Sequence, residues 1–270
     1  MSDLVLLFFF ALFVNVIAYS KGFYLMEKRE GGEAPTLFDL LALFFIYLGT
    51  AFFLAPYLNQ LLFPSTLKVG FSHLFNTSIS LALLLLFPYL TKPHLFKKIW
   101  KDDSIKQFGS IPSDLLFGVL TYLIAFPVVL FAGELTEFIV EKLFGPQNYE
   151  QVAVTYLKAM FGSYQTILIA GITIIVFGPI IEELLFRGFL QTYLKRYMNQ
   201  RRAIFLASLL FAFFHFSAIQ SVGNISIISS LTAFSLFLGW VYEKRASLFS
   251  SIGLHMAFNA VTFIRLFFEG

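Results

Sequence analysis

The sequence predicts an all-α, polytopic membrane protein, and two observations support this prediction. Hydrophobic residues make up 58% of the 270-residue chain, and charged residues only 13%. Soluble domains carry roughly 25% charged residues, so this chain has too few charges to cover a soluble globule. Apolar runs of about 20 residues, long enough to cross a bilayer as helices, also recur along the chain. A water-soluble enzyme, a soluble binding module and a disordered chain are therefore excluded.

Eight apolar segments are predicted to be membrane-spanning helices, because a helix satisfies its own backbone polar groups within the bilayer. They cover approximately Leu4–Tyr19, Leu37–Phe63, Phe71–Leu90, Asp114–Val140, Gln165–Leu190, Ala203–Ala218, Ile225–Tyr242 and Leu248–Phe268. A shorter mixed strip, Tyr149–Gly162, is predicted to be an interfacial helix. Together the eight spans are expected to form one bundle, a single transmembrane domain over residues 1–270.

The basic residues predict how the spans are oriented. Of the 19 Lys and Arg residues, 14 lie in the connections after spans one, three, five and seven, and three lie on the opposite side. The positive-inside rule places the richer side in the cytosol, so both termini are expected on the non-cytosolic side. The net charge of +3 is thus a topology signal rather than a sign of nucleic-acid binding. The absence of Cys excludes disulfides, a thiolate nucleophile and a Cys-ligated metal.

The fifth predicted span carries charges that are expensive inside a bilayer. Each ionisable group costs about 2.5–3.5 kcal/mol on insertion scales, so a group that is kept there has a use. Glu183 and Arg187 are four residues apart, on one helix face and in the favourable order for an ion pair. Glu182 points elsewhere and has no obvious partner. The alternative is that both glutamates pair with Arg187 as a structural staple. Gly178-Pro179 is expected to loosen this helix and admit water.

Two further spans carry histidines with a partner four residues away. Phe211 and His215 share one face of the sixth span, and His255 and Asn259 share one face of the eighth. Alone, His215 is more typical of a hydrogen-bonded packing residue than of a functional one, and the pair of His255 and Asn259 is as compatible with an interhelical polar clamp as with a functional site. At 1.5 Å per residue, however, the two histidines, Asn259 and Glu182 all lie roughly 10 to 18 Å above the cytosolic ends of their helices. A shared polar site in the cytosolic half of the bilayer is therefore predicted.

A carboxylate, two imidazoles and a carboxamide in one pocket suit hydrolysis. Glu182 is the candidate general base that takes a proton from water while the water attacks a carbonyl carbon. Neutral histidine and asparagine side chains would donate hydrogen bonds to the developing oxyanion. The alternative is a divalent metal such as zinc, held by Glu182, His215 and His255. The chain lacks an H-E-x-x-H motif, so no cofactor is favoured.

Three motifs on these helices resemble those of a known family. Glu182-Glu183-x-x-x-Arg187, Phe211-x-x-x-His215 and His255-x-x-x-Asn259 match, in order, the E-E-x-x-x-R, F-x-x-x-H and H-x-x-x-N motifs of the CPBP family. This is the CAAX-protease and bacteriocin-processing (Abi) group of intramembrane proteases, which includes the Rce1-type prenyl-protein proteases. The resemblance covers Gln165–Phe268, the expected protease core, and no motif was found before it.

The resemblance implies a fold and a set of roles. It implies eight helices around a conical polar cavity open to the cytosol and the bilayer. Glu182 would activate water with help from His215, and His255 and Asn259 would form the oxyanion hole. Glu183 and Arg187 would brace the site, and Phe211 would shape it. Members of the family have been described both as metalloproteases and as metal-independent glutamate proteases, and the second mechanism is favoured here.

The expected function is hydrolysis of a peptide bond in a membrane-associated protein or peptide, of which a prenylated CAAX-type protein is one case. The expected partners are the lipid bilayer and that substrate, with no nucleic acid. Two alternatives come from other classes. A proton-coupled transporter would use membrane carboxylates and histidines as a relay, but it would be expected to carry internal repeats, and none stands out. A non-catalytic immunity or scaffold protein would use the polar cluster only as a clamp.

Overall fold

The structure, a computed structural model, describes residues 2–26, 33–62, 69–102, 109–146, 152–159 and 163–269. Regular structure in these ranges is helical, apart from one isolated bridge between Lys101 and Ser247. The elements before residue 160 are α1 (Ser2–Ser20), α2 (Leu37–Gly49), η1 (Thr50–Leu54), α3 (Ala55–Leu62), α4 (Val69–Thr91), α5 (Pro93–Trp100), α6 (Ile111–Phe144) and α7 (Val152–Ala159). The later ones are α8 (Tyr164–Gly171), η2 (Ile172–Phe177), α9 (Gly178–Glu183), η3 (Leu184–Gln191), α10 (Thr192–Leu194), α11 (Gln200–Phe214), η4 (Ala218–Gly223), α12 (Asn224–Arg245) and α13 (Leu248–Glu269).

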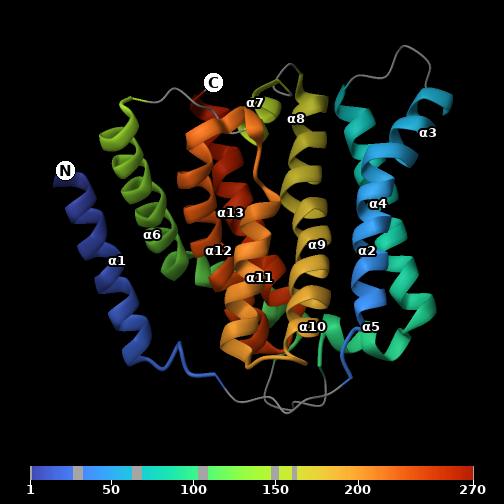
Figure 1. Cartoon of the computed structure of the whole chain (residues 1–270), viewed down its shortest axis with the longest axis horizontal. Helices are drawn as coiled ribbons and strands as arrows, with labels where there is room; N and C mark the ends of the chain where they lie inside the picture. Colours follow the sequence, from blue (N-terminus) through green and yellow to red (C-terminus); the bar gives the residue numbers. More distant parts are fainter. Residues whose placement is uncertain are drawn as a thin grey trace.

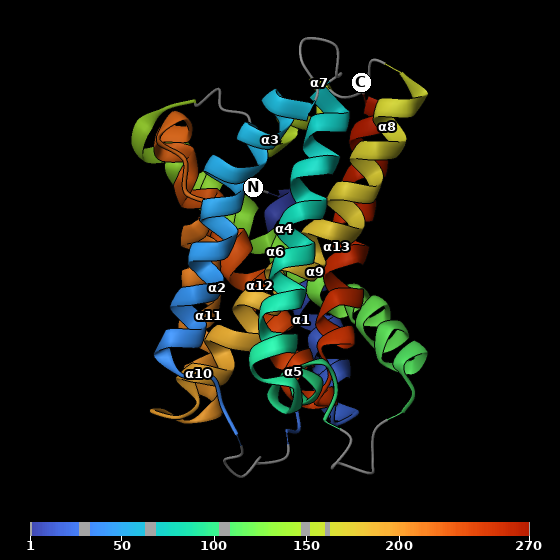
Figure 2. The same ribbon diagram turned by 90° about the vertical axis from the view of Figure 1, so that its right-hand side faces the viewer.

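The long helices run up and down through a single bundle (Figure 1). α1 lies at one edge beside α6, and α2, α3 and α4 lie at the opposite edge. Between them stand α9, α11, α12 and α13, the helices that carry the predicted site residues. Figure 2, turned by a quarter, shows α2 and α4 in front of these central helices. Both chain termini lie toward the same end of the bundle.

In the described residues, seven helical stretches are long and apolar enough to cross a membrane. They are Asp3–Ser20, Leu37–Leu62, Phe71–Thr91, Ile111–Phe144, Tyr164–Leu194, Ala218–Arg245 and Leu248–Phe268. They correspond to seven of the eight predicted spans, although Phe63, the predicted end of the second span, lies outside the described residues. Within the predicted interfacial strip, α7 is helical, and positions 149–151 and 160–162 also lie outside the described residues.

The sixth predicted span, Ala203–Ala218, corresponds to α11, which begins three residues earlier and ends four residues earlier than predicted. α11 has 15 residues, about 22 Å of helix against a hydrocarbon core of about 30 Å. It begins where Asn199 caps the Arg202 N–H, and it ends at His215, whose Nδ1 turns back to the Phe211 carbonyl. Beyond it, the connection to α12 is irregular, and Asn224 at the start of α12 donates to the Ser217 carbonyl. A count of eight spans therefore remains a prediction.

α6 and α13 approach each other closely through glycines. A Cβ added at Gly118 of α6 would lie 2.0 Å from the Ser250 carbonyl oxygen of α13, and one at Gly253 would lie 2.4 Å from the Leu115 carbonyl oxygen. Small residues allow such backbone contact, which replaces the hydrophobic driving force that is missing between helices in lipid. This contact fixes the position of α13, and with it His255, against α6.

Replacing Gly118 with Ala is expected to lower the free energy of unfolding by about 1–3 kcal/mol, because the added methyl group meets backbone atoms that have no rotamer in which to escape. The measurement is denaturant or thermal unfolding of the purified protein in detergent micelles. Gly49→Ala is the matched control, since a Cβ at Gly49 would meet nothing within 4 Å. Equal stability of the two variants would contradict the proposed contact.

Two buried carboxylates tie the helix ends together at the end of the bundle where the basic connections lie. Asp114, at the start of α6, is fully buried and pairs with Lys101 at 2.9 Å and with Arg245 of α12 at 2.7 Å. Glu243 of α12, also buried, pairs with Lys195 at 2.9 Å. Some of the basic residues that predicted the membrane topology therefore also neutralise buried carboxylates.

Candidate active site

The helical stretch that carries the two glutamates is irregular on both sides of them. α9 lies between two π-helical stretches, η2 and η3. A π-helical turn widens the helix by one residue, and such turns are frequent at functional sites. The predicted loosening around Gly178-Pro179 is confirmed, because the Gly178 N–H donates five residues back to the Thr173 carbonyl.

Asn259 of α13 supports this irregular turn. With the same five-residue spacing, the N–H of residue 179 would donate to the Ile174 carbonyl. Residue 179 is a proline, however, and has no N–H. The Asn259 Nδ2 atom donates to the Ile174 oxygen instead, at 2.8 Å. Asn259 therefore satisfies a backbone carbonyl that the proline leaves open, and one of its two N–H groups is committed to this bond.

Glu183 lies at the centre of a buried cluster. Its side chain has no exposed surface, and its Oε1 atom accepts hydrogen bonds from Arg187 Nη1 at 3.1 Å and from His255 Nδ1 at 2.7 Å. The ion pair predicted from the four-residue spacing is confirmed. Arg187, at 1% exposure, also stacks over the Phe211 ring, 4.5 Å from its centroid.

Ser235 of α12 completes the environment of Arg187, and the sequence analysis missed it. Arg187 Nη2 donates to the Ser235 hydroxyl at 2.6 Å and to the Ser235 carbonyl at 3.4 Å. The two residues are 48 positions apart, so no helical periodicity links them. A buried guanidinium needs acceptors for all of its donors, which is the one signal that pointed to an unidentified partner.

Glu182 has a different environment from its neighbour. Its side chain is 25% exposed, and its Oε2 atom has no hydrogen-bond partner. His215 Nε2 lies 3.9 Å from this oxygen and His255 Nε2 lies 3.7 Å from it. The structure thus brings together three of the four predicted catalytic residues. The hydrogen bond of the fourth, Asn259, goes to Ile174 instead of to any of these three.

The partners of the two histidines define which ring nitrogen carries the proton. His215 Nδ1 is 2.9 Å from the Phe211 carbonyl and His255 Nδ1 is 2.7 Å from the Glu183 carboxylate. Carbonyl and carboxylate oxygens only accept, so both Nδ1 atoms are donors, and a neutral ring then has an acceptor at Nε2. Both Nε2 atoms therefore present lone pairs toward Glu182. Neutral His255 cannot donate to an oxyanion in this geometry, and only the doubly protonated ring can.

Removing the Ser235 hydroxyl should weaken this cluster. We expect Ser235→Ala to lower the free energy of unfolding by about 1.5–3 kcal/mol, the range for hydrogen bonds to charged groups. Ser230→Ala is the matched control, because Ser230 lies on the same helix and its hydroxyl bonds to the Ile227 carbonyl. Parallel chemical denaturation of both variants gives the comparison, and a loss no greater than in the control would remove Ser235 from the cluster.

Residues 164–261 match the family described as type II CAAX prenyl endopeptidase Rce1-like. This segment is Rce1-like. The Rce1-like segment contains all three motifs, from Glu182 to Asn259, and agrees with the resemblance to the CPBP family drawn from the residues. No curated protein and no solved structure matches the chain significantly.

A metal in this site would be held by Glu182, His215 and His255, since the two Nε2 atoms lie 3.9 and 3.7 Å from Glu182 Oε2. Among the residues that the structure describes, no group of three or more histidine, aspartate or glutamate side chains is arranged to hold a metal ion.

Proposed function

We propose that this protein is an intramembrane endopeptidase in which Glu182 activates a water molecule to hydrolyse a peptide bond. The convergence of Glu182 Oε2 with His215 Nε2 and His255 Nε2, at 3.9 and 3.7 Å, carries the proposal. These separations are too long for direct hydrogen bonds. Glu182 Oε2 and His215 Nε2 offer two acceptors for the two protons of a single water molecule, and the third atom, His255 Nε2, is a donor when its ring is doubly protonated. The Rce1-like segment supports the protease class.

In the proposed reaction, Glu182 takes a proton from water as the water oxygen attacks the carbonyl carbon of the peptide. The carbonyl π electrons move to the oxygen and form a tetrahedral oxyanion. Doubly protonated His255 donates to that oxyanion through Nε2, and Asn259 would assist with its remaining N–H. The C–N bond then breaks, and Glu182 returns its proton to the leaving nitrogen. His215 positions the water through its Nε2 acceptor.

The buried cluster would hold this geometry during turnover. Glu183 fixes the His255 ring by accepting from Nδ1, and Arg187 neutralises Glu183. A charged His255 would lie between the two carboxylates, which is a favourable electrostatic setting for an oxyanion donor. Phe211 packs against both the Arg187 guanidinium and the His215 ring.

The proposal also includes topology and substrate class. We infer eight spans, with α11 and the irregular chain after it as the sixth, one domain over residues 1–270, and a protease core over 165–268. Both termini would lie on the non-cytosolic side, and the site would lie in a cavity open to the cytosolic half of the bilayer. The substrate would be a membrane-associated protein or peptide, and the family match favours a CAAX-type one.

Substrate trapping tests the proposal. Membranes from cells that produce the wild type or Glu182→Gln are compared by quantitative mass spectrometry, and uncut proteins should accumulate only with the variant. A chelator added to the wild-type membranes should leave cleavage unchanged. If no protein accumulates and no peptide bond is cut, the non-catalytic scaffold replaces the protease as the proposed function. Proton flux in proteoliposomes that requires His255 would favour the transporter.

A further inference from the structure

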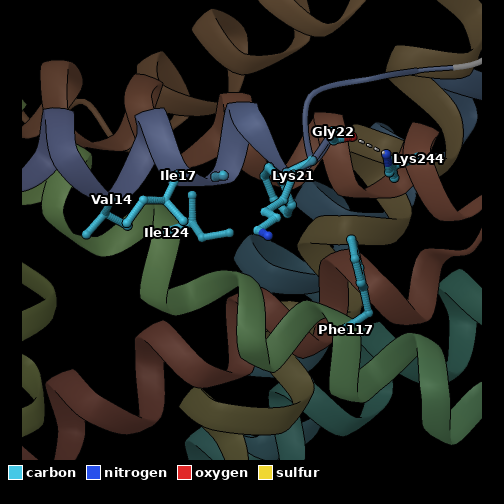
Figure 3. Close-up of a pocket in the computed structure, with 9 residues that line it drawn as sticks. Val14, Ile17, Lys21, Gly22, Phe117, Ile124 and Lys244 are labelled. Atoms are coloured by element: carbon cyan, nitrogen blue, oxygen red, sulfur yellow. Dashed lines mark hydrogen bonds between the residues drawn. The ribbon is translucent and has the colours of Figure 1, made fainter.

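A groove outside the proposed active site lies along the inner side of α1 (Figure 3). It has a volume of about 490 Å³ and lies between α1, α6 and the end of α12. Val14 and Ile17 of α1 and Ile124 and Phe117 of α6 form apolar walls. None of the residues that line it is acidic.

Two lysines give this groove a charged end. Lys21 directly follows the candidate span that ends at Ser20, so we expect its backbone at the boundary between hydrocarbon and headgroups. The Lys21 residue is exposed, and Figure 3 shows its side chain extending into the hollow between Ile124 and Phe117. The Lys244 ammonium lines the same end and donates to the carbonyl oxygens of Gly22 and Leu25. Lys244 thereby holds the turn after α1 in place.

The groove has a charged end and an apolar end, as a lipid has a charged headgroup and an apolar tail. The cationic groups lie at the end of the candidate span Asp3–Ser20, and only apolar side chains line the part of the groove that extends back along that span. Each basic residue near a membrane surface contributes about 1 kcal/mol of attraction for anionic lipids. A molecule with a negative head and a hydrocarbon tail therefore complements both parts of the groove at once.

We propose that this groove is a binding site for an anionic phospholipid, whose phosphate contacts Lys21 and whose acyl chain lies between α1 and α6. The site differs from the hydrolytic centre in its residues, and the proposal does not depend on the proposed function. α1 is attached to α6 partly by one hydrogen bond, from Asn15 Nδ2 to the Ile124 carbonyl at 3.3 Å. A lipid bound beside it would stabilise the α1–α6 pair by mass action.

The test uses the full chain purified in detergent micelles. Native mass spectrometry measures how much phosphatidylglycerol or phosphatidylcholine the protein retains, and thermal unfolding is followed with each lipid added. The wild type should retain phosphatidylglycerol preferentially and should unfold at a higher temperature with it. Lys21→Glu should weaken phosphatidylglycerol retention about tenfold or more.

Arg201→Glu is the matched control, since it makes the same change of charge in another basic connection and does not line the groove. It should retain phosphatidylglycerol as the wild type does. Ile17→Trp should reduce retention by filling the apolar part while leaving both lysines intact, and it serves if Lys21→Glu does not fold. Equal retention of the two lipids by the wild type, equal loss in Lys21→Glu and Arg201→Glu, or full retention in Ile17→Trp would overturn the proposal.

Discussion

Glu182→Gln is expected to lower the kcat of peptide-bond cleavage by about 10²–10⁴-fold, the usual contribution of a general base. Glutamine keeps the shape of the side chain but cannot take a proton from water. The fold should not suffer, because Glu182 Oε2 makes no hydrogen bond and the side chain is partly exposed. The measurement is single-turnover cleavage of a substrate from the trapping experiment, with Tm recorded on the same samples.

A control on another helix separates loss of the base from a general loss of charge. Glu137 of α6 is exposed and lies outside the site, so Glu137→Gln should keep full activity. His215→Ala should resemble Glu182→Gln in activity, but it should also lower Tm because it removes the bond to the Phe211 carbonyl. A fully active Glu182→Gln enzyme would rule out Glu182 as the base, whatever the behaviour of the histidine variant.

The second large effect is on stability. Arg187→Ala is expected to lower the free energy of unfolding by about 3–5 kcal/mol, because removing one partner of a buried ion pair leaves an uncompensated charge. Here that charge is Glu183, which has no exposed surface and would keep only His255 as a partner. Urea or thermal unfolding in micelles measures the loss.

A double variant distinguishes this explanation from simple loss of packing. Combining Arg187→Met with Glu183→Gln removes both charges while keeping much of the volume, so it should be more stable than Arg187→Ala. The stability of Arg187→Lys should lie between that of Arg187→Ala and that of the double variant. A lysine ammonium lacks the planar guanidinium fork that reaches both Glu183 and Ser235. If Arg187→Ala unfolds at the wild-type midpoint, the buried pair does not stabilise the bundle.

The parts of the fold and site that were predictable rest on local spacing. The apolar runs indicated the helices because a bilayer leaves few alternatives for a backbone. The pair of Glu183 and Arg187 followed from their positions on one helix face, and it is present at 3.1 Å. The approach of Glu182 to His215 and His255 was inferred from depth alone, which works because helix rise is nearly constant.

The rest depends on contacts between distant segments or on changes of helical register. The bond from Arg187 to Ser235 joins η3 to α12, and no spacing rule reaches across 48 residues. The bond from Asn259 to Ile174 exists because of a π-helical turn, which apolar periodicity does not reveal. α11 ends at Phe214, next to the bond between His215 Nδ1 and the Phe211 carbonyl, a contact that apolar periodicity does not reveal.

The protonation pattern of the two rings has a consequence for inhibitor design. Because both Nδ1 hydrogens are committed to Phe211 and Glu183, a neutral site presents three acceptors and no donor to whatever occupies it. A compound that offers two hydroxyl hydrogens on one carbon, such as a hydrated ketone, satisfies two of these three acceptors. The oxygens of a phosphonate or carboxylate inhibitor would face the acceptor atoms of the site with lone pairs of their own. Such a group would have to be protonated before it could donate a hydrogen bond. While both rings are neutral, ketone hydrates should therefore bind more tightly than anionic transition-state mimics.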